Sequence, residues 1–337
     1  MIQNASDERT LFFFELTPER ILQSVESAGY QCTGRCMAMN SFENRVYDLE
    51  LENEQGSGGA VQRNKIVAKF YRPGRWTKEQ ILEEHQFLLD LQEAEIPVIA
   101  PIPFPDGETL KLTLQGEIFY ALFPKVGGRA PDEFTPEQLR QVGRLTARIH
   151  TVGAARKALH RRTLMPETYN RVELNWMLSG NLIPLEFRSR YTQLVLEILK
   201  VAQAQFQNVP MHRVHGDCHP GNLLWHPTQG AFFLDFDDMM NAPAAQDLWL
   251  LVPGRDEESL RMREHLLEGY EEMRGLDRTQ LKLVESLRAL RFIHYSVWLA
   301  QRWADPAFPR AFPQFGTHRY WQDETEDLER QLALIQR

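Results

Sequence analysis

Polar side chains that suit phosphoryl transfer are concentrated in one stretch of this 337-residue chain. Asp217 and Asn222 lie five residues apart in His-Gly-Asp-Cys-His-Pro-Gly-Asn, and Asp235 follows thirteen residues later in Leu-Asp-Phe-Asp-Asp. Asp217 can accept or orient the proton of a hydroxyl group. The amide oxygen of Asn222 and the carboxylate of Asp235 are hard oxygen donors that can share Mg²⁺. The set therefore predicts Asp217 as a catalytic residue and Asn222 and Asp235 as metal ligands.

The spacing matches that of protein kinases, which place an Asn five residues after the catalytic-loop Asp and a metal-binding Asp beyond it. His215, Cys218 and His219 could instead bind zinc, because imidazole and thiolate are zinc ligands. Kinase spacing explains the segment without zinc, and no second ligand pair is present, so we favour phosphoryl transfer. For Asp237 and Asp238, two interpretations stay open: solvated acids, or further contacts to Mg²⁺ or substrate.

A lysine and a glutamate that could handle phosphates occur earlier in the chain. Lys69 ends an apolar run over 65–70, and Glu84 follows fifteen residues later in the next predicted helix. In kinases a lysine in this arrangement contacts the phosphates of ATP while a glutamate fixes it. Glu79 and Glu83 are alternative partners for Lys69.

The predicted elements that must position these residues are mainly strands in the first part of the chain and mainly helices in the second part. The first part predicts a helix from Thr17 to Gly29, a hairpin of strands at 46–51 and 65–70, a helix opened by a Thr77–Gln80 capping box, and strands near 110–114 and 118–123. The second part predicts helices over 139–152, 185–206, 258–273 and 281–302, with a small hairpin at 223–225 and 232–234. We therefore expect an α+β fold with two lobes: a β-rich N-terminal lobe of residues 1–124 and a mainly α C-terminal lobe of residues 125–337. A cleft between such lobes is a common ligand site.

Composition excludes several classes of function. The chain has 38 Lys and Arg against 46 Asp and Glu, and the net charge of −8 disfavours nucleic acid or an anionic membrane as a partner. Three cysteines without framework spacing favour reduced thiols, and we interpret Cys32 and Cys36 as ordinary buried residues rather than redox sensors. No secretory signal or membrane-spanning apolar run is present, so we expect a cytoplasmic monomer.

The motifs around Asp217 and Asp235 resemble those of the aminoglycoside phosphotransferase and choline kinase branch of the protein kinase-like fold. Other segments resemble the bacterial stress response kinases within that branch, and these matches are spread over nearly the whole chain: 40–47, 67–73, 81–87, 127–129 and 302–309. The resemblance implies a bilobal protein kinase-like fold and a cytoplasmic, ATP- and Mg²⁺-dependent Ser/Thr protein kinase with a role in stress.

The resemblance also implies roles for individual residues. Asp217 resembles the proton acceptor, and Asn222 and Asp235 resemble the Mg²⁺ ligands, with Asp235 also counted as an active-site residue. Ser41, in the loop between the first two strands, resembles a position that contacts ATP. That loop departs from ordinary kinases, because it has no glycine over 40–46 to allow close backbone approach to phosphates.

Three further assignments have different grounds. Glu84 is favoured as the partner of Lys69, because phosphotransferase helices carry a Glu followed by three residues and an apolar pair. From its position in the chain alone, the main chain of Phe123–Val126, which includes Lys125, is expected to bond the adenine of ATP. For Asp247, helix capping is favoured, and the resemblance adds a second role, bracing the catalytic loop.

These observations predict an ATP:protein phosphotransferase whose acceptors are Ser and Thr residues of protein substrates. One alternative is a kinase acting on an amino alcohol, sugar or aminoglycoside, since the catalytic motif is shared across the branch. The other is a nucleotide-binding scaffold without turnover. Arg140, Arg144 and Arg148 repeat every four residues, and we favour a solvated helix face over a surface that docks an acidic protein.

Overall fold

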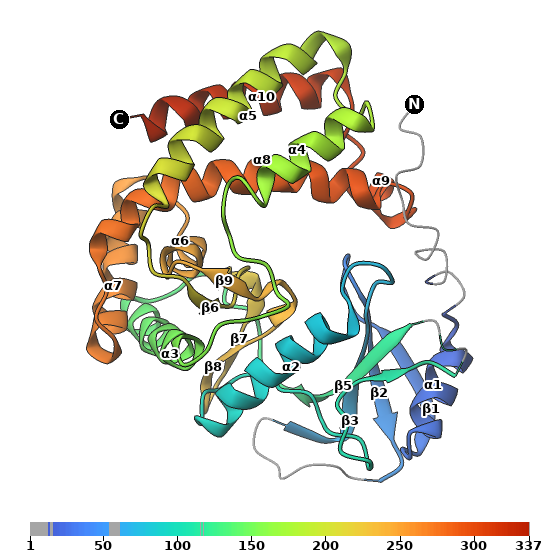
Figure 1. Ribbon diagram of the computed structural model, residues 1–337. Coiled ribbons are helices and arrows are strands. Elements are labelled where there is room, and N and C mark those ends of the chain that lie inside the picture. The colour runs from blue at the N-terminus through green and yellow to red at the C-terminus, as the bar shows by residue number, and fades with distance from the viewer. Residues whose placement is uncertain (1–12, 14–15, 54–60, 115, 117, 337) are drawn as a thin grey trace.

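The computed structural model describes residues 13, 16–53, 61–114, 116 and 118–336. Its N-terminal part is an antiparallel sheet with the strand order β1-β2-β3-β5-β4, covered by α1 and α2 (Figure 1). The bounds are α1 (Pro18–Ser27), β1 (Cys32–Ala38), β2 (Arg45–Leu51), β3 (Val61–Phe70), α2 (Lys78–Glu93), β4 (Lys111–Leu112) and β5 (Phe119–Val126). The domain boundary predicted at 124/125 falls inside β5.

The predicted hairpin is confirmed as β2 and β3, which pair antiparallel with Val46 opposite Lys69 and Leu49 opposite Ile66. The segment 54–60 between the two strands lies outside the described residues. Ala68 and Phe70 of β3 are buried in the cluster that includes Ile21 and Val25 of α1. Because successive side chains of a strand alternate between its faces, Lys69 points to the opposite face of the sheet.

Helix α2 begins at the predicted capping box. The Gln80 amide donates to Thr77 Oγ1 at 3.3 Å, and the Thr77 amide donates to Gln80 Oε1 at 2.9 Å. The buried face of the helix includes Ile81, Glu84 and Leu88. Since residues three and four apart share one helix face, the apolar residues that dock α2 also carry the Glu84 carboxylate inward.

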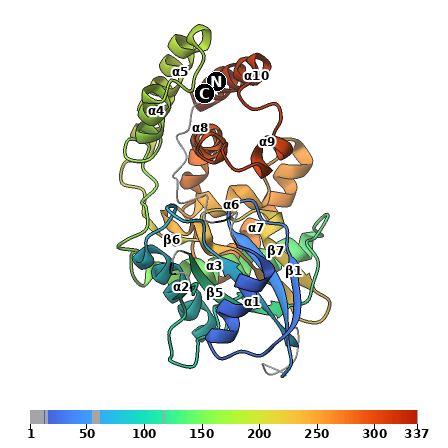
Figure 2. The same ribbon diagram turned by 90° about the vertical axis from the view of Figure 1, so that its right-hand side faces the viewer.

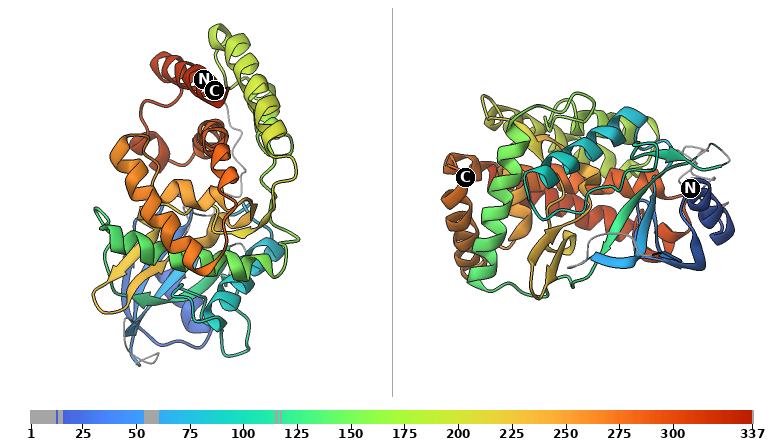
Figure 3. Two further views of the ribbon diagram at one scale, coloured as in Figure 1. Left: turned by 90° about the vertical axis from the view of Figure 1, so that its left-hand side faces the viewer. Right: turned by 90° about the horizontal axis from the view of Figure 1, so that it is seen from below.

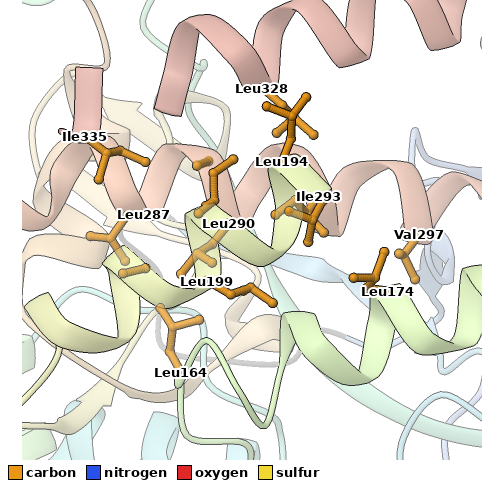
Figure 4. Packing of buried hydrophobic residues seen from close by; sticks show 14 of the residues in the cluster. Leu164, Leu174, Leu194, Leu199, Leu287, Leu290, Ile293, Val297, Leu328 and Ile335 are labelled. Carbon is orange, nitrogen blue, oxygen red and sulfur yellow. The ribbon is translucent and has the colours of Figure 1, made fainter. Parts of the chain in front are cut away.

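The C-terminal part is mainly helical, which confirms the predicted α+β class. Helices α5 and α10 lie side by side, with α8 running beneath them and α4 alongside (Figures 1 and 2). The helices are α3 (Pro136–Ala154), α4 (Asn170–Ser179), α5 (Leu185–Gln205), α6 (Ala245–Leu251), α7 (Glu257–Met273), α8 (Val284–Arg302), α9 (Ala307–Ala311) and α10 (His318–Ile335). Leu194 of α5, Ile293 of α8 and Leu328 of α10 meet in the apolar core of this layer (Figure 4).

Helices α3 and α7 pack closely along each other (Figure 3). At Gly143 an added Cβ would lie 2.1 Å from the Leu266 carbonyl oxygen, so the close approach requires glycine. Arg140 pairs with Glu268 of α7 at 3.0 Å, and Arg144 pairs with Glu272 at 2.9 Å. Arg148 donates to the Ala94 and Glu95 carbonyls. The expectation of a simply solvated arginine face is therefore wrong, because these side chains join α3 to its neighbours.

Two short strand pairs and two 3-10 turns carry the motifs that suit phosphoryl transfer. The predicted small hairpin is confirmed as β7 and β8, while β6 and β9, which the sequence did not predict, form a second pair beside it. The bounds are β6 (His212–Val214), β7 (Leu223–His226), β8 (Gly230–Phe233), β9 (Met240–Ala242), and the turns Pro220–Asn222 and Phe236–Asp238, with a further 3-10 turn at Arg278–Leu283. Among the described residues, no helix is long and apolar enough to cross a membrane.

Candidate active site

The segment between β6 and β7 is fixed from behind by Asp247 of α6. Its carboxylate accepts the backbone N–H groups of His215 at 2.8 Å and Gly216 at 2.9 Å, and it contacts His150 Nε2 at 3.0 Å. Asp247 makes no capping bond, and α6 has no side-chain cap. The favoured capping role is therefore wrong, and the carboxylate braces the loop that carries Asp217.

His215 joins this loop to the segment that carries Asp235. Its Nε2 contacts the Leu234 carbonyl oxygen at 2.7 Å, and its Nδ1 accepts the Asp217 amide at 3.3 Å. Within the described residues, no three His, Cys, Asp or Glu side chains are grouped as metal ligands. The buried imidazole therefore holds the backbone of both segments.

Asn222 and Asp235 are brought together by the main chain. The Leu234 amide donates to the Asn222 carbonyl at 2.9 Å, and Asn222 Nδ2 donates to the Asp217 carbonyl at 2.9 Å. The amide nitrogen of Asn222 is thus used internally, which leaves its side-chain oxygen for a ligand. Asp235 has a left-handed backbone (φ 55°, ψ 65°), and its side chain is 53% exposed. A non-glycine residue in this conformation carries strain, which is often found at functional sites.

Lys69 crosses from the sheet to this segment. Its Nζ lies 3.3 Å from Asp235 Oδ1, 3.1 Å from Asp237 Oδ1 and 3.4 Å from Glu84 Oε1. Burial disfavours the ammonium, but the Asp237 and Glu84 carboxylates outweigh it and raise the pKa of Lys69 well above its usual value. Lys69 therefore stays cationic where phosphates would enter.

Of the three glutamates considered, only Glu84 contacts Lys69. The other oxygen of Glu84 pairs with Arg161 at 3.1 Å. Glu83 instead accepts backbone N–H groups of the loop after α3, and Glu79 lies in the first turn of α2. The structure thus gives Glu84 the position from which it can fix Lys69.

Asp237 is a buried member of this ion-pair network, so its interpretation as a solvated acid is wrong. It contacts Lys69 and Arg75, and burial of the acid is outweighed by these cations, which hold the pKa of Asp237 well below its usual range. Asp238 is partly exposed and pairs with the other Arg75 nitrogen at 2.6 Å. Arg75 thus fixes both acids, a role that no sequence motif indicated.

Asp217 is paired with two basic side chains of the C-terminal part. Its Oδ1 is 2.8 Å from Arg291 of α8, and its Oδ2 is 3.5 Å from His219. Burial opposes ionisation, but His219 and Arg291 hold the pKa of Asp217 well below its usual range. A carboxylate that stays ionised is a weak base, so this geometry suits orienting a hydroxyl more than removing its proton early.

A cavity of about 360 Å³ opens beside Asp217 and Asp235. Lys69 and Glu84 lie behind its wall and do not line it; Lys69 is linked to it through its contact with Asp235. Residues proposed for catalysis, metal and ATP line it together: Ser41, Asp217, Asn222 and Asp235. Phe123 and Lys125 do not line this cavity. Lys125 is directed to Asp48 at 3.4 Å, and Phe123 is buried in the core that α2 shares with the helices. The main-chain assignment for adenine therefore stays a prediction.

The loop that carries Ser41 is attached to the helical part through contacts that sequence reasoning missed. Glu43 accepts from Arg302 Nε at 2.5 Å and from Trp298 Nε1 at 2.8 Å, and the Phe42 ring lies 5.5 Å from that of Phe312. Burial of Glu43 is outweighed by Arg75 and Arg302, which lower its pKa to about 2. The sequence did mark both partners of this contact, because segments 40–47 and 302–309 each match the family motifs, but it did not show that they touch.

Comparison with known proteins finds kinases that match over nearly the whole chain. A family model described as "Phosphotransferase enzyme family" matches residues 38–282. Stress response kinase A of Escherichia coli strain K12 is 38% identical over 325 residues, covering 96% of this chain and 95% of that protein. Serine/threonine protein kinase RdoA of Salmonella typhimurium strain LT2 is 37% identical over 330 residues, covering 98% and 96%. The resemblance to stress response kinases is thereby confirmed.

Solved structures show the same fold in small-molecule kinases. The amicoumacin kinase hAmiN, in complex with AMP-PNP, Ca²⁺ and Ami, superposes with a TM-score of 0.73 at 20% identity, covering 96% of this chain and 95% of that one. A microcompartment-associated aminopropanol kinase gives 0.64 at 16% identity, covering 94% and 96%. These likenesses confirm the bilobal kinase-like fold.

Proposed function

Because this chain belongs to the phosphotransferase enzyme family, we propose that it transfers the γ-phosphoryl group of ATP to Ser and Thr hydroxyls of protein substrates. One observation carries the proposal. Lys69 of the sheet pairs with Asp235 of the helical part at 3.3 Å, and Asp235 lines one cavity together with Asp217. This is the arrangement that phosphoryl transfer requires, in which positioning and charge neutralisation do most of the work.

The residues at the cavity fit a divalent cation, which we propose is Mg²⁺. Asn222 uses its amide nitrogen internally and keeps its oxygen, and the Asp235 carboxylate is half exposed toward the cavity. Both are hard oxygen donors, which Mg²⁺ prefers. When bound, the ion would neutralise charge on the phosphates of ATP.

The chain's own groups divide the remaining work. Lys69, kept cationic by its carboxylate neighbours, holds phosphate oxygens, and Glu84 keeps the ammonium in place. Asp217 accepts a hydrogen bond from the acceptor hydroxyl and aims its oxygen for in-line attack. Arg291 is then displaced from the Asp217 oxygen or shares it with the hydroxyl. Ser41 contacts ATP from the loop above the cavity.

The choice of acceptor is supported by relatives named as stress response and Ser/Thr protein kinases, which match over nearly the full chain. The solved neighbours favour a second candidate, a small-molecule kinase, because their names refer to amicoumacin and aminopropanol. A monomeric, cytoplasmic protein stays our prediction from the sequence.

The protein-kinase and small-molecule-kinase candidates are distinguished by whether labelled phosphate is transferred to protein or to small molecules. The purified protein is incubated with γ-³²P-ATP, Mg²⁺ and a desalted cell extract, with and without the small-molecule fraction. Acid-stable label on protein Ser and Thr without small molecules supports the proposal. Label only in the small-molecule fraction supports the second candidate. ATP that is bound but never consumed supports a scaffold.

A further inference from the structure

We propose that a second cavity, beside the catalytic cleft, binds an acidic side chain of the protein acceptor; this inference rests on the proposed function. The cavity has a volume of about 230 Å³ and lies between the loop 72–76, α4 and α8. It shares walls with the cleft: Arg75, Tyr169, Asp238, Met240, His294 and Trp298. A side chain bound in it would therefore belong to a molecule that also reaches the catalytic cavity.

The charges around this cavity leave one cation uncompensated. Arg72 pairs with Asp305 at 3.0 Å, and Arg75 and Arg302 pair with acids as described above. The Arg162 guanidinium also lines the cavity, but it forms no ion pair or hydrogen bond with any residue that the structure describes. Among the lining arginines, Arg162 is thus the one available to an outside anion.

Aromatic rings hold Arg162 where a ligand could reach it. Its guanidinium carbon lies 5.6 Å from the ring centroid of Trp76 and 5.2 Å from that of Tyr169. Stacking of this kind limits the conformations of the long side chain without using its N–H donors. The residue itself is exposed. An oxyanion could therefore bind to a guanidinium that is already oriented.

Two buried donors in the same wall also lack acceptors. Trp76 Nε1 and Arg72 Nη1 have no hydrogen-bond partner among the described residues, and Arg72 is only 5% exposed. Leaving a buried donor unpaired is unfavourable, and carboxylate oxygens would satisfy such groups. A cavity lined by unpaired hydrogen-bond donors and an unpaired cation favours an anionic ligand. We therefore expect an Asp or Glu near the acceptor Ser or Thr of the substrate.

Peptide binding tests this site without depending on turnover. Fluorescein-labelled peptides carry one Thr in an Ala, Gly and Gln background, with a single Glu moved through the flanking positions. Affinity for the full-length protein, with AMP-PNP and Mg²⁺, is measured by anisotropy. We expect one Glu position to improve affinity about tenfold over the all-Gln peptide. Arg162→Gln should remove that preference and leave the affinity of the all-Gln peptide unchanged.

Charge reversal and a matched control sharpen the result. Arg162→Glu should favour Lys over Glu at the same position, whereas Arg319→Gln, at an exposed arginine of α10, should behave as wild type. Equal affinity for all peptides in the wild type, or a Glu preference that survives in Arg162→Gln, would overturn the inference. If Arg162-dependent binding is found but none of the same peptides is phosphorylated when ATP replaces AMP-PNP, the anion site stands and the protein-kinase proposal fails.

Discussion

The Lys69 ammonium and the Asp235 carboxylate lie 3.3 Å apart although 166 residues separate them in the chain. The sheet aims Lys69 away from the apolar cluster behind β3, and the turn after β8 presents Asp235 with a left-handed backbone. Neither residue could hold phosphates alone. Lys69 without a metal ligand, or Asp235 and its metal without a lysine, would compensate only part of the negative charge of ATP. Their contact is what makes the cavity a candidate phosphotransfer site.

Asp217→Asn should abolish transfer and spare nucleotide binding. The variant keeps a polar group of the same size but loses the charge that orients the hydroxyl. We expect kcat to fall by roughly 10²- to 10⁴-fold while the Kd for ATP changes less than about threefold. Stopped-assay rates and equilibrium ATP binding check both values. An Asp217→Asn enzyme with wild-type kcat would contradict the role given to this carboxylate.

Asp235→Asn should weaken nucleotide affinity only when a divalent cation is present. The wild type is expected to bind ATP at least about tenfold more tightly with Mg²⁺ than with EDTA, and the variant should show little difference. Calorimetric titration with and without Mg²⁺ measures this. Asp323→Asn, at a surface ion pair of α10, is the matched control and should retain the metal effect. Metal-dependent affinity that persists in Asp235→Asn would exclude Asp235 as a ligand.

Glu43→Gln should loosen the loop that carries Ser41. The carboxylate neutralises Arg302, so its loss leaves this buried cation without an acidic partner among the described residues, whereas Arg72 keeps Asp305. Breaking such a pair costs about 3 kcal/mol. Urea unfolding should show a loss of that size, and hydrogen exchange should speed up over 40–45. If both quantities match the wild type, the loop is held by Phe42 packing and not by charge.

Stability should decrease with rising pH because of Glu324 on α10. Burial, only partly offset by the hydrogen bond from Ser296, raises the pKa of this acid from 4.5 to about 7. The folded state therefore holds a proton that the unfolded chain has released between these values. The free energy of unfolding falls there by no more than about 1.4 kcal/mol per pH unit.

Glu324→Gln cannot ionise, so it should remove this part of the pH dependence. The variant should resemble the wild type near pH 5 and exceed its Tm near pH 8. Thermal unfolding at three pH values makes the comparison. Parallel Tm curves for the two proteins would show that Glu324 does not titrate in this range.

Local signals predicted much of the fold and the site. These signals come from residues that are close in the sequence: the capping box at Thr77, the alternation over 65–70, and the spacing of Asp217, Asn222 and Asp235. Contacts between distant segments were harder to predict. Asp247 sits at a helix start, where capping is the usual role, and only tertiary packing turns it toward the backbone of Gly216.

The partners of charged side chains were the hardest feature to predict from the sequence. Arg75 and Arg291 lie in ordinary polar patterns, and the acids that they fix at the site, Asp237 and Asp217, are 162 and 74 positions away along the chain. Short elements were also missed, because β6 and β9 have only three residues each and show no period. Helical period alone could not show that Arg140 and Arg144 pair with α7.

Comparative phosphosite mapping tests the central claim most directly. A dephosphorylated extract is treated with ATP, Mg²⁺ and either the wild type or Asp217→Asn, and phosphopeptides are quantified by mass spectrometry. The account predicts Ser and Thr sites that gain phosphate with the wild type alone. Identical phosphopeptide profiles for the two enzymes, in an extract where the wild type consumes ATP, would contradict it.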